Sequence, residues 1–273
     1  MLDTPAAWAI AIFGALLIGV SKTGLGGCGI LAVALFAQIL PSRASTGYVL
    51  PMLICADIVA VAVFRRHAVW THVIRMFPPT AAGVILGALA LRTPFLHSNM
   101  QVKVLIGGII TVLVIFTYVR RYQQKQVGES PGAGRSDVRP DAMRTGHQSW
   151  LTVISTGLLA GFLTMVANAA GPVTTLYLLA AQLPMMEFIG TGAWLFFLLN
   201  TFKVPFSAGL HLITGPSLLL DAELAPFVIA GAFWGKWLVS FLNQRVFEEL
   251  ALLFALLSGI NMLISPIFGH HGS

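Results

Sequence analysis

The sequence predicts an all-α polytopic membrane protein with about eight membrane helices, on the evidence of its composition, its apolar runs and its paired glycine breaks. Of the 273 residues, 57% are hydrophobic and 10% are charged, and the mean hydropathy is +0.85. A soluble domain carries about 25% charged residues, so this chain has too few polar side chains to cover a water-soluble globule. Roughly 20 apolar residues cross a bilayer as a helix, and the chain is long enough for about eight such spans.

The apolar runs give the expected helices, because lipid offers the backbone no hydrogen-bond partner and a spanning segment must satisfy its own groups. In the first half they lie at about 5–20, 30–40, 47–64, 73–91 and 102–119. In the second half they lie at about 151–166, 172–183, 188–202, 224–241 and 246–266. The segment Phe206–Leu220 is interrupted by His211, Gly215 and Pro216, and we expect it to be a connection at the membrane interface.

A polar stretch at 121–150 separates the two halves. It is rich in charge, glycine, proline and serine, a composition that buries no core and predicts a flexible linker. Residues 120–144 contain six of the 16 lysines and arginines, which places the linker in the cytoplasm by the positive-inside rule. The net charge of +6 therefore indicates membrane orientation and no nucleic-acid partner.

The two halves resemble each other, which predicts a first membrane repeat at 1–120 and a second at 151–273. At offsets of 142 to 148 the matched pairs are Gly19 and Gly161, Gly29 and Gly171, Asp57 and Asn200, Gly83 and Gly231, and Gly87 and Gly235. The basic residues favour inverted halves with both termini outside, provided that each glycine-rich break turns a pair of short helices back. A parallel repeat of four spans with both termini inside explains the first half equally well.

Each half contains one break in its apolar pattern. The first, Gly19–Gly29, has five glycines in eleven residues, and each glycine disfavours a helix by about 1 kcal/mol relative to alanine. The second, Gly161–Pro172, contains an Asn-Ala-Ala-Gly-Pro sequence. Because proline suits the first turn of a helix, we expect new helices to begin at Pro172 and at about Gly29.

Paired interruptions at matching places in two halves are typical of the midplane site of a secondary transporter. Two helix N-termini aimed at one point favour an anion, and Lys22 adds a full positive charge. The predicted substrate-binding residues are Ser21, Lys22, Thr23, Gly24, Gly26, Gly27, Asn168, Gly171 and Asn200. The alternative is that the glycines only allow close helix packing, which is our interpretation of Gly83/Gly87, Gly157/Gly161 and Gly231/Gly235.

Asp57 is the predicted coupling residue, since an ionisable group inside a span is costly and marks a functional candidate. It either carries a coupling proton or pairs with Lys22 and leaves when the anion arrives; the alternative is a purely structural hydrogen bond. We expect Lys203 and Lys236 to extend toward the lipid headgroups. The seven histidines have no metal-ligand spacing, so the sequence predicts neither a metal nor a cofactor.

The chain resembles the sulfite exporter TauE/SafE family of membrane permeases over almost its whole length. The resemblance rests on the two breaks and on the stretch from Leu183-Pro184 to Val204-Pro205. It implies about eight helices from a duplicated half, and transport of sulfur-containing or organic anions such as sulfite or small sulfonates. Many members carry a denser glycine cluster than the run at 168–173, which leaves the exact anion open.

The predicted function is secondary active transport of a small anion across the cell inner (plasma) membrane, by alternating access coupled to a proton or sodium gradient. The alternatives are an anion channel and a non-transporting membrane sensor. An intramembrane enzyme would need a catalytic dyad, whereas the spans offer one aspartate and no well-placed histidine, so we predict no enzymatic activity. The oligomeric state is left open.

Overall fold

The computed structural model describes residues 4–24, 29–39, 45–92 and 149–268. In these ranges every regular element is a helix, which confirms the all-α prediction. In chain order they are α1 (Pro5–Thr23), α2 (Gly29–Ile39), α3 (Ser45–Tyr48), α4 (Leu50–Phe64), the 3₁₀ turn η1 (Arg65–His67), α5 (Trp70–Arg92), α7 (Trp150–Ala167), α8 (Ala170–Ala180), α9 (Met185–Gly209), α10 (Gly215–Val239) and α11 (Gln244–Phe268). The run expected at 102–119 and the linker lie outside the described residues.

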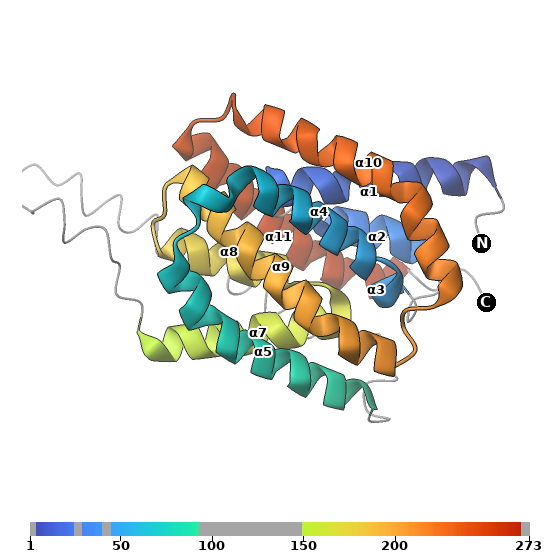
Figure 1. The fold of residues 1–273 in the computed structure, drawn as a ribbon, viewed down its shortest axis with the longest axis horizontal. Coiled ribbons are helices and arrows are strands. Elements are labelled where there is room, and N and C mark those ends of the chain that lie inside the picture. Colours follow the sequence, from blue (N-terminus) through green and yellow to red (C-terminus); the bar gives the residue numbers. More distant parts are fainter. Residues whose placement is uncertain (1–3, 25–28, 40–44, 93–148, 269–273) are drawn as a thin grey trace, which may run out of the picture.

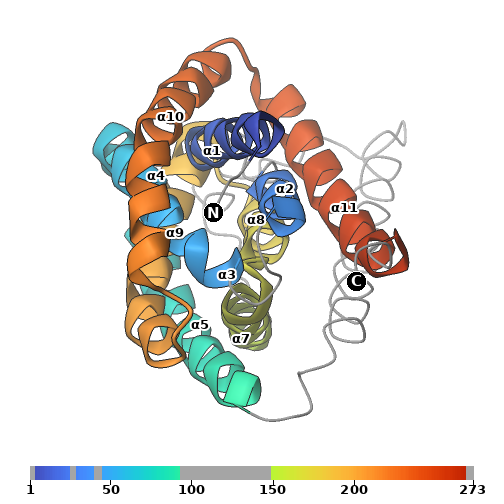
Figure 2. The same cartoon turned by 90° about the vertical axis from the view of Figure 1, so that its right-hand side faces the viewer.

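The part of the chain that the structure describes has five helices long and apolar enough to cross a membrane, namely α1, α5, α7, α9 and α10. The long helices lie side by side as a bundle (Figure 1). Seen end-on, the short helices α2 and α8 lie in the interior, between α1, α7 and α9 and the outer helix α11 (Figure 2). Almost every side chain of α8 is buried, as expected for a helix that is apolar on all sides.

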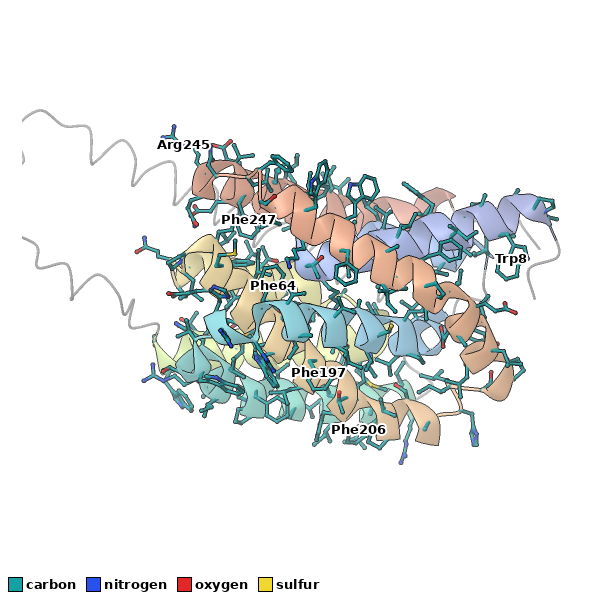
Figure 3. All side chains as sticks on the ribbon, turned by 45° about the horizontal axis from the view of Figure 1, so that its top comes forward. Trp8, Phe64, Phe197, Phe206, Arg245 and Phe247 are labelled. Carbon is teal, nitrogen blue, oxygen red and sulfur yellow. The ribbon has the colours of Figure 1, made fainter. Side chains whose placement is uncertain are left out.

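Opposite ends of the bundle hold the starts of α1 and α7. We call these ends the Pro5 end and the Trp150 end. From the Pro5 end α1 enters the bundle and α2 returns, whereas from the Trp150 end α7 enters and α8 returns (Figure 1). Phe64 and Arg245 lie toward the Trp150 end and Trp8 lies at the Pro5 end (Figure 3). The basic residues of η1 and Arg245 thus share one end of the bundle.

Three packed helix pairs each combine one helix from the first half with one from the second: α5 packs along α7, α10 packs along α1, and α4 packs on α9. Small residues at these crossings let the backbones approach closely. A Cβ atom added to Gly161 would overlap the carbonyl oxygen of Thr80, and one added to Gly19 would overlap that of Val228. Gly19 and Gly161 are therefore packing residues inside helices and do not belong to the breaks. The reciprocal packing of α5 on α7 and of α10 on α1 supports the two-repeat interpretation, which stays a prediction.

The prediction that Phe206–Leu220 is an interfacial connection is wrong. Helix α9 continues to Gly209 and α10 begins at Gly215, so that only residues 210–214 connect them. The reason is local: Thr214 caps α10 by accepting a hydrogen bond from the Ser217 amide at 3.3 Å, and Pro216 lies in the first turn, where its missing N–H has no consequence. The proline opens a helix here and does not interrupt one.

Candidate functional site

The first break is shorter than the sequence predicts. Helix α1 continues through Ser21 and Lys22 to Thr23, and the Gly24 amide donates to the Val20 carbonyl at 2.9 Å. Helix α2 begins at Gly29, as expected. Lys22 therefore lies in the last turn of α1, where a cation interacts favourably with the helix dipole.

The second break consists of two residues between α7 and α8. Asn168 adopts the left-handed conformation, with φ of 52°, which asparagine tolerates better than most residues. Its amide donates to the Thr164 carbonyl at 3.0 Å, and the amide of Ala169 donates to Leu163 at 3.2 Å. Helix α8 begins at Ala170, two residues before the predicted start. The left-handed conformation of Asn168 changes the direction of the backbone at a single residue, so that a longer loop is not needed.

A buried ion pair joins the end of α1 to α4. The Lys22 Nζ atom lies 2.9 Å from Oδ1 of Asp57, whose side chain is fully buried. Asn200 of α9 donates from Nδ2 to the other carboxylate oxygen at 2.6 Å. The structure thus brings together Asp57 and Asn200, which the sequence analysis matched as equivalent positions, and places both next to Lys22.

Lys203 lies one helical turn after Asn200 and is 1% exposed. Its Nζ donates to the Thr164 carbonyl at 2.9 Å and to Oδ1 of Asn168. The expectation that Lys203 extends to the headgroups is wrong, because α9 continues to Gly209 and the Lys203 side chain contacts the end of α7. The Thr164 carbonyl also accepts from the Asn168 amide, so the Lys203 ammonium is a second donor to this carbonyl at the end of α7. Lys236, by contrast, is exposed on α10.

A pocket lies where the end of α1 meets α8 and the half of α9 nearer the Trp150 end. Ser21, Lys22, Thr174 and Thr175 supply its polar wall. The Lys22 ammonium lies 4.2 Å from the centre of the Phe196 ring, which is part of the apolar wall. The cavity volume is about 30 Å³, room for two or three water molecules. An oxyanion of four or more heavy atoms would need a wider pocket than this.

Comparison with known proteins assigns the chain to a family. The sequence profile of the sulfite exporter TauE/SafE family matches residues 11–262. The chain belongs to the TauE/SafE family. No curated protein matches this TauE/SafE chain, and no solved structure matches it. Family membership and the apolar helices make it a multi-pass membrane protein, and they support transport of a small anion.

The remaining predicted site residues of the TauE/SafE chain take other places. Thr23 is fully buried and donates to the Ala232 carbonyl of α10 at 2.6 Å, so it joins α1 to α10 and does not line the pocket. Gly24 lines the pocket, and Gly171 lies in the first turn of α8. The predicted residues Gly26 and Gly27 lie outside the described residues.

Sequence reasoning missed two features of this TauE/SafE protein, one in the pocket and one elsewhere in α10. Thr174 and Thr175 line the pocket, and their place within six residues of the second break is a signal that could have found them. Asp221, in α10, is 6% exposed, and neither of its carboxylate oxygens has a hydrogen-bond partner among the residues that the structure describes. The apolar run expected at 224–241 begins after Asp221, so this residue was not among the charges predicted inside a span.

Proposed function

We propose that this TauE/SafE protein is a secondary active transporter of a small anion, of sulfur-containing type (sulfite or a sulfonate) or an organic acid, in the cell inner membrane. The observation that carries the proposal is the Lys22 ammonium, which lines a pocket between α1, α8 and α9 and, among the described residues, forms its ion pair with the buried carboxylate of Asp57. Burying charged groups in a membrane protein is costly and is retained where they serve a function.

The surroundings of Lys22 suit an oxyanion. The hydroxyl-bearing residues Ser21, Thr174 and Thr175 line the same pocket, and hydroxyls and an ammonium are good donors to charged oxygen atoms. The Phe196 ring offers an apolar surface for the carbon portion of a sulfonate or organic acid.

We propose that Asp57 couples transport to a proton. In the unprotonated form the carboxylate competes with the anion for Lys22; a proton on Asp57 removes that competition and frees the ammonium. Anion and proton then move together. Both carboxylate oxygens face nitrogen donors, from Lys22 and Asn200, an arrangement that suits a proton better than a sodium ion, which needs oxygen ligands.

Uptake of radiolabelled sulfite by the purified protein in liposomes tests this function. A carrier gives saturable uptake that is stimulated when the vesicles are preloaded with unlabelled sulfite. Flux that rises linearly with concentration and shows no such counterflow would indicate an anion channel. A folded protein that carries no sulfite, sulfonate or small carboxylate would contradict the proposal and favour a sensor.

A further inference from the structure

We infer that Lys203 and Asn168 form a second anion position, so that the anion passes between two ammonium groups on either side of Asp57. The inference rests on the proposed transport function, and it assigns a role to Lys203 that the Lys22 pocket does not require.

The charge of Lys203 is the first reason. Its Nζ contacts two neutral oxygens, those of Thr164 and Asn168, and no carboxylate within the described ranges. Lysine has three N–H donors, and two of them have acceptors among the described residues, so the third can serve a ligand. The Asp57 carboxylate attracts this ammonium through space but forms its ion pair with Lys22, and a bound anion would give Lys203 a charge in direct contact, which a buried ammonium favours. Lys22, by contrast, already has its counter-ion in Asp57.

The second reason is the equivalence of the two positions. Thr164, whose carbonyl accepts from Lys203, corresponds to Lys22 at the offset of 142 that relates the breaks. Each broken helix, α1 and α7, therefore has an ammonium at its last turn. Since α1 and α7 enter from opposite ends of the bundle (Figure 1), these two ammonium groups occupy matching places seen from opposite faces of the membrane.

The third reason is their order along α9. Phe196, beneath Lys22, precedes Lys203 by seven residues, which is about 10 Å along a helix. Asn200 lies between them and holds Asp57. The Lys22 pocket extends toward the Trp150 end, whereas Lys203 lies toward the Pro5 end and is enclosed. We infer that the Lys203 position opens when the Lys22 pocket closes, as alternating access requires.

Transport kinetics measured separately from each membrane face test the inference, with membrane vesicles of right-side-out and inside-out orientation and radiolabelled sulfite as the probe. Lys203→Met should raise the apparent KM about tenfold at the face of the Pro5 end and less than twofold at the opposite face. Lys22→Met should show the reverse pattern. Lys236→Met is the matched control, because the same substitution at an exposed lysine of α10 should change neither value.

A second variant, Asn168→Asp, tests the same position if Lys203→Met does not fold. Asn168→Asp keeps an oxygen acceptor for Lys203 and suits the left-handed backbone, but it supplies a counter-charge in place of the anion. Asn168→Asp should raise the KM at the Pro5-end face as Lys203→Met does. Lys203→Arg, which keeps the positive charge, should give the wild-type KM at that face. An unchanged KM in transport-competent Asn168→Asp, or an equal change at both faces, would overturn the second position and leave the Lys22 site standing. Failure of the wild-type protein to transport would instead overturn both.

Discussion

Asn200 donates a 2.6 Å hydrogen bond to Asp57, and the predicted repeat makes these two residues equivalent in the two halves of the chain. They lie where α4 packs on α9. If the halves are related by a two-fold axis, α4 and α9 are equivalent helices, and their contact lies on that axis. Two carboxylates at this distance would repel each other, so an amide in one half and a carboxylate in the other form a stable pair. The asymmetry leaves Asp57 one oxygen for Lys22, and it makes the two halves chemically different at their point of contact.

Replacing Lys22 with alanine should raise the apparent KM for anion uptake about tenfold, which corresponds to about 1.4 kcal/mol. The reason is the loss of the ammonium that lines the pocket. Initial rates of sulfite uptake in proteoliposomes measure the effect. Lys22→Arg keeps the charge and should stay within a few-fold of the wild type. Wild-type kinetics in folded Lys22→Ala protein would remove Lys22 from the binding site.

Asp57→Asn should abolish accumulation driven by a pH gradient while it spares exchange of internal for external anion. The amide carries no negative charge, so Lys22 stays free at every pH and no proton moves with the anion. Accumulation under an imposed gradient and counterflow without one are measured on the same vesicles. Accumulation at the wild-type level would show that the coupling proton binds elsewhere.

The ion pair between Lys22 and Asp57 should also be visible in stability. Lys22→Ala alone leaves a fully buried carboxylate without its counter-ion, a change that costs about 3–5 kcal/mol when a buried pair is broken. Combining it with Asp57→Asn removes the unpaired charge and should recover most of that loss. Thermal unfolding of the two single variants and the double variant in one detergent gives the coupling energy. Strictly additive losses would contradict a direct pair.

Thr23→Val should lower stability but leave the apparent KM within twofold of the wild type. The Thr23 hydroxyl donates to the Ala232 carbonyl, and such bonds between membrane helices contribute about 0.6 kcal/mol on average. Thermal unfolding and uptake kinetics of the same preparation separate the two effects. A large rise in KM with unchanged stability would return Thr23 to the binding site.

Gly161→Ala should destabilise the protein by about 1–3 kcal/mol, the usual cost of overpacking. The added methyl group would overlap the carbonyl oxygen of Thr80, whereas a Cβ at Gly209 meets nothing within 4 Å. Gly209→Ala is therefore the matched control and should leave the melting temperature unchanged. Equal melting temperatures for the two variants would contradict the close crossing of α5 and α7.

The sequence alone determined the membrane class, the helical fold and the places of the two breaks. These follow from hydropathy and from the preferences of glycine, asparagine and proline, which act on a few neighbouring residues. It also indicated Lys22 and Asp57, because a charge inside an apolar run is visible without any structure.

Only the tertiary structure decided which polar groups meet. Lys203 contacts a carbonyl 39 positions away, Asp57 contacts an amide 143 positions away, and the hydroxyl of Thr23 contacts α10 and not the pocket. Burial and pairing of a side chain depend on helices from the other half of the chain, and no local pattern of residues records which helices those are.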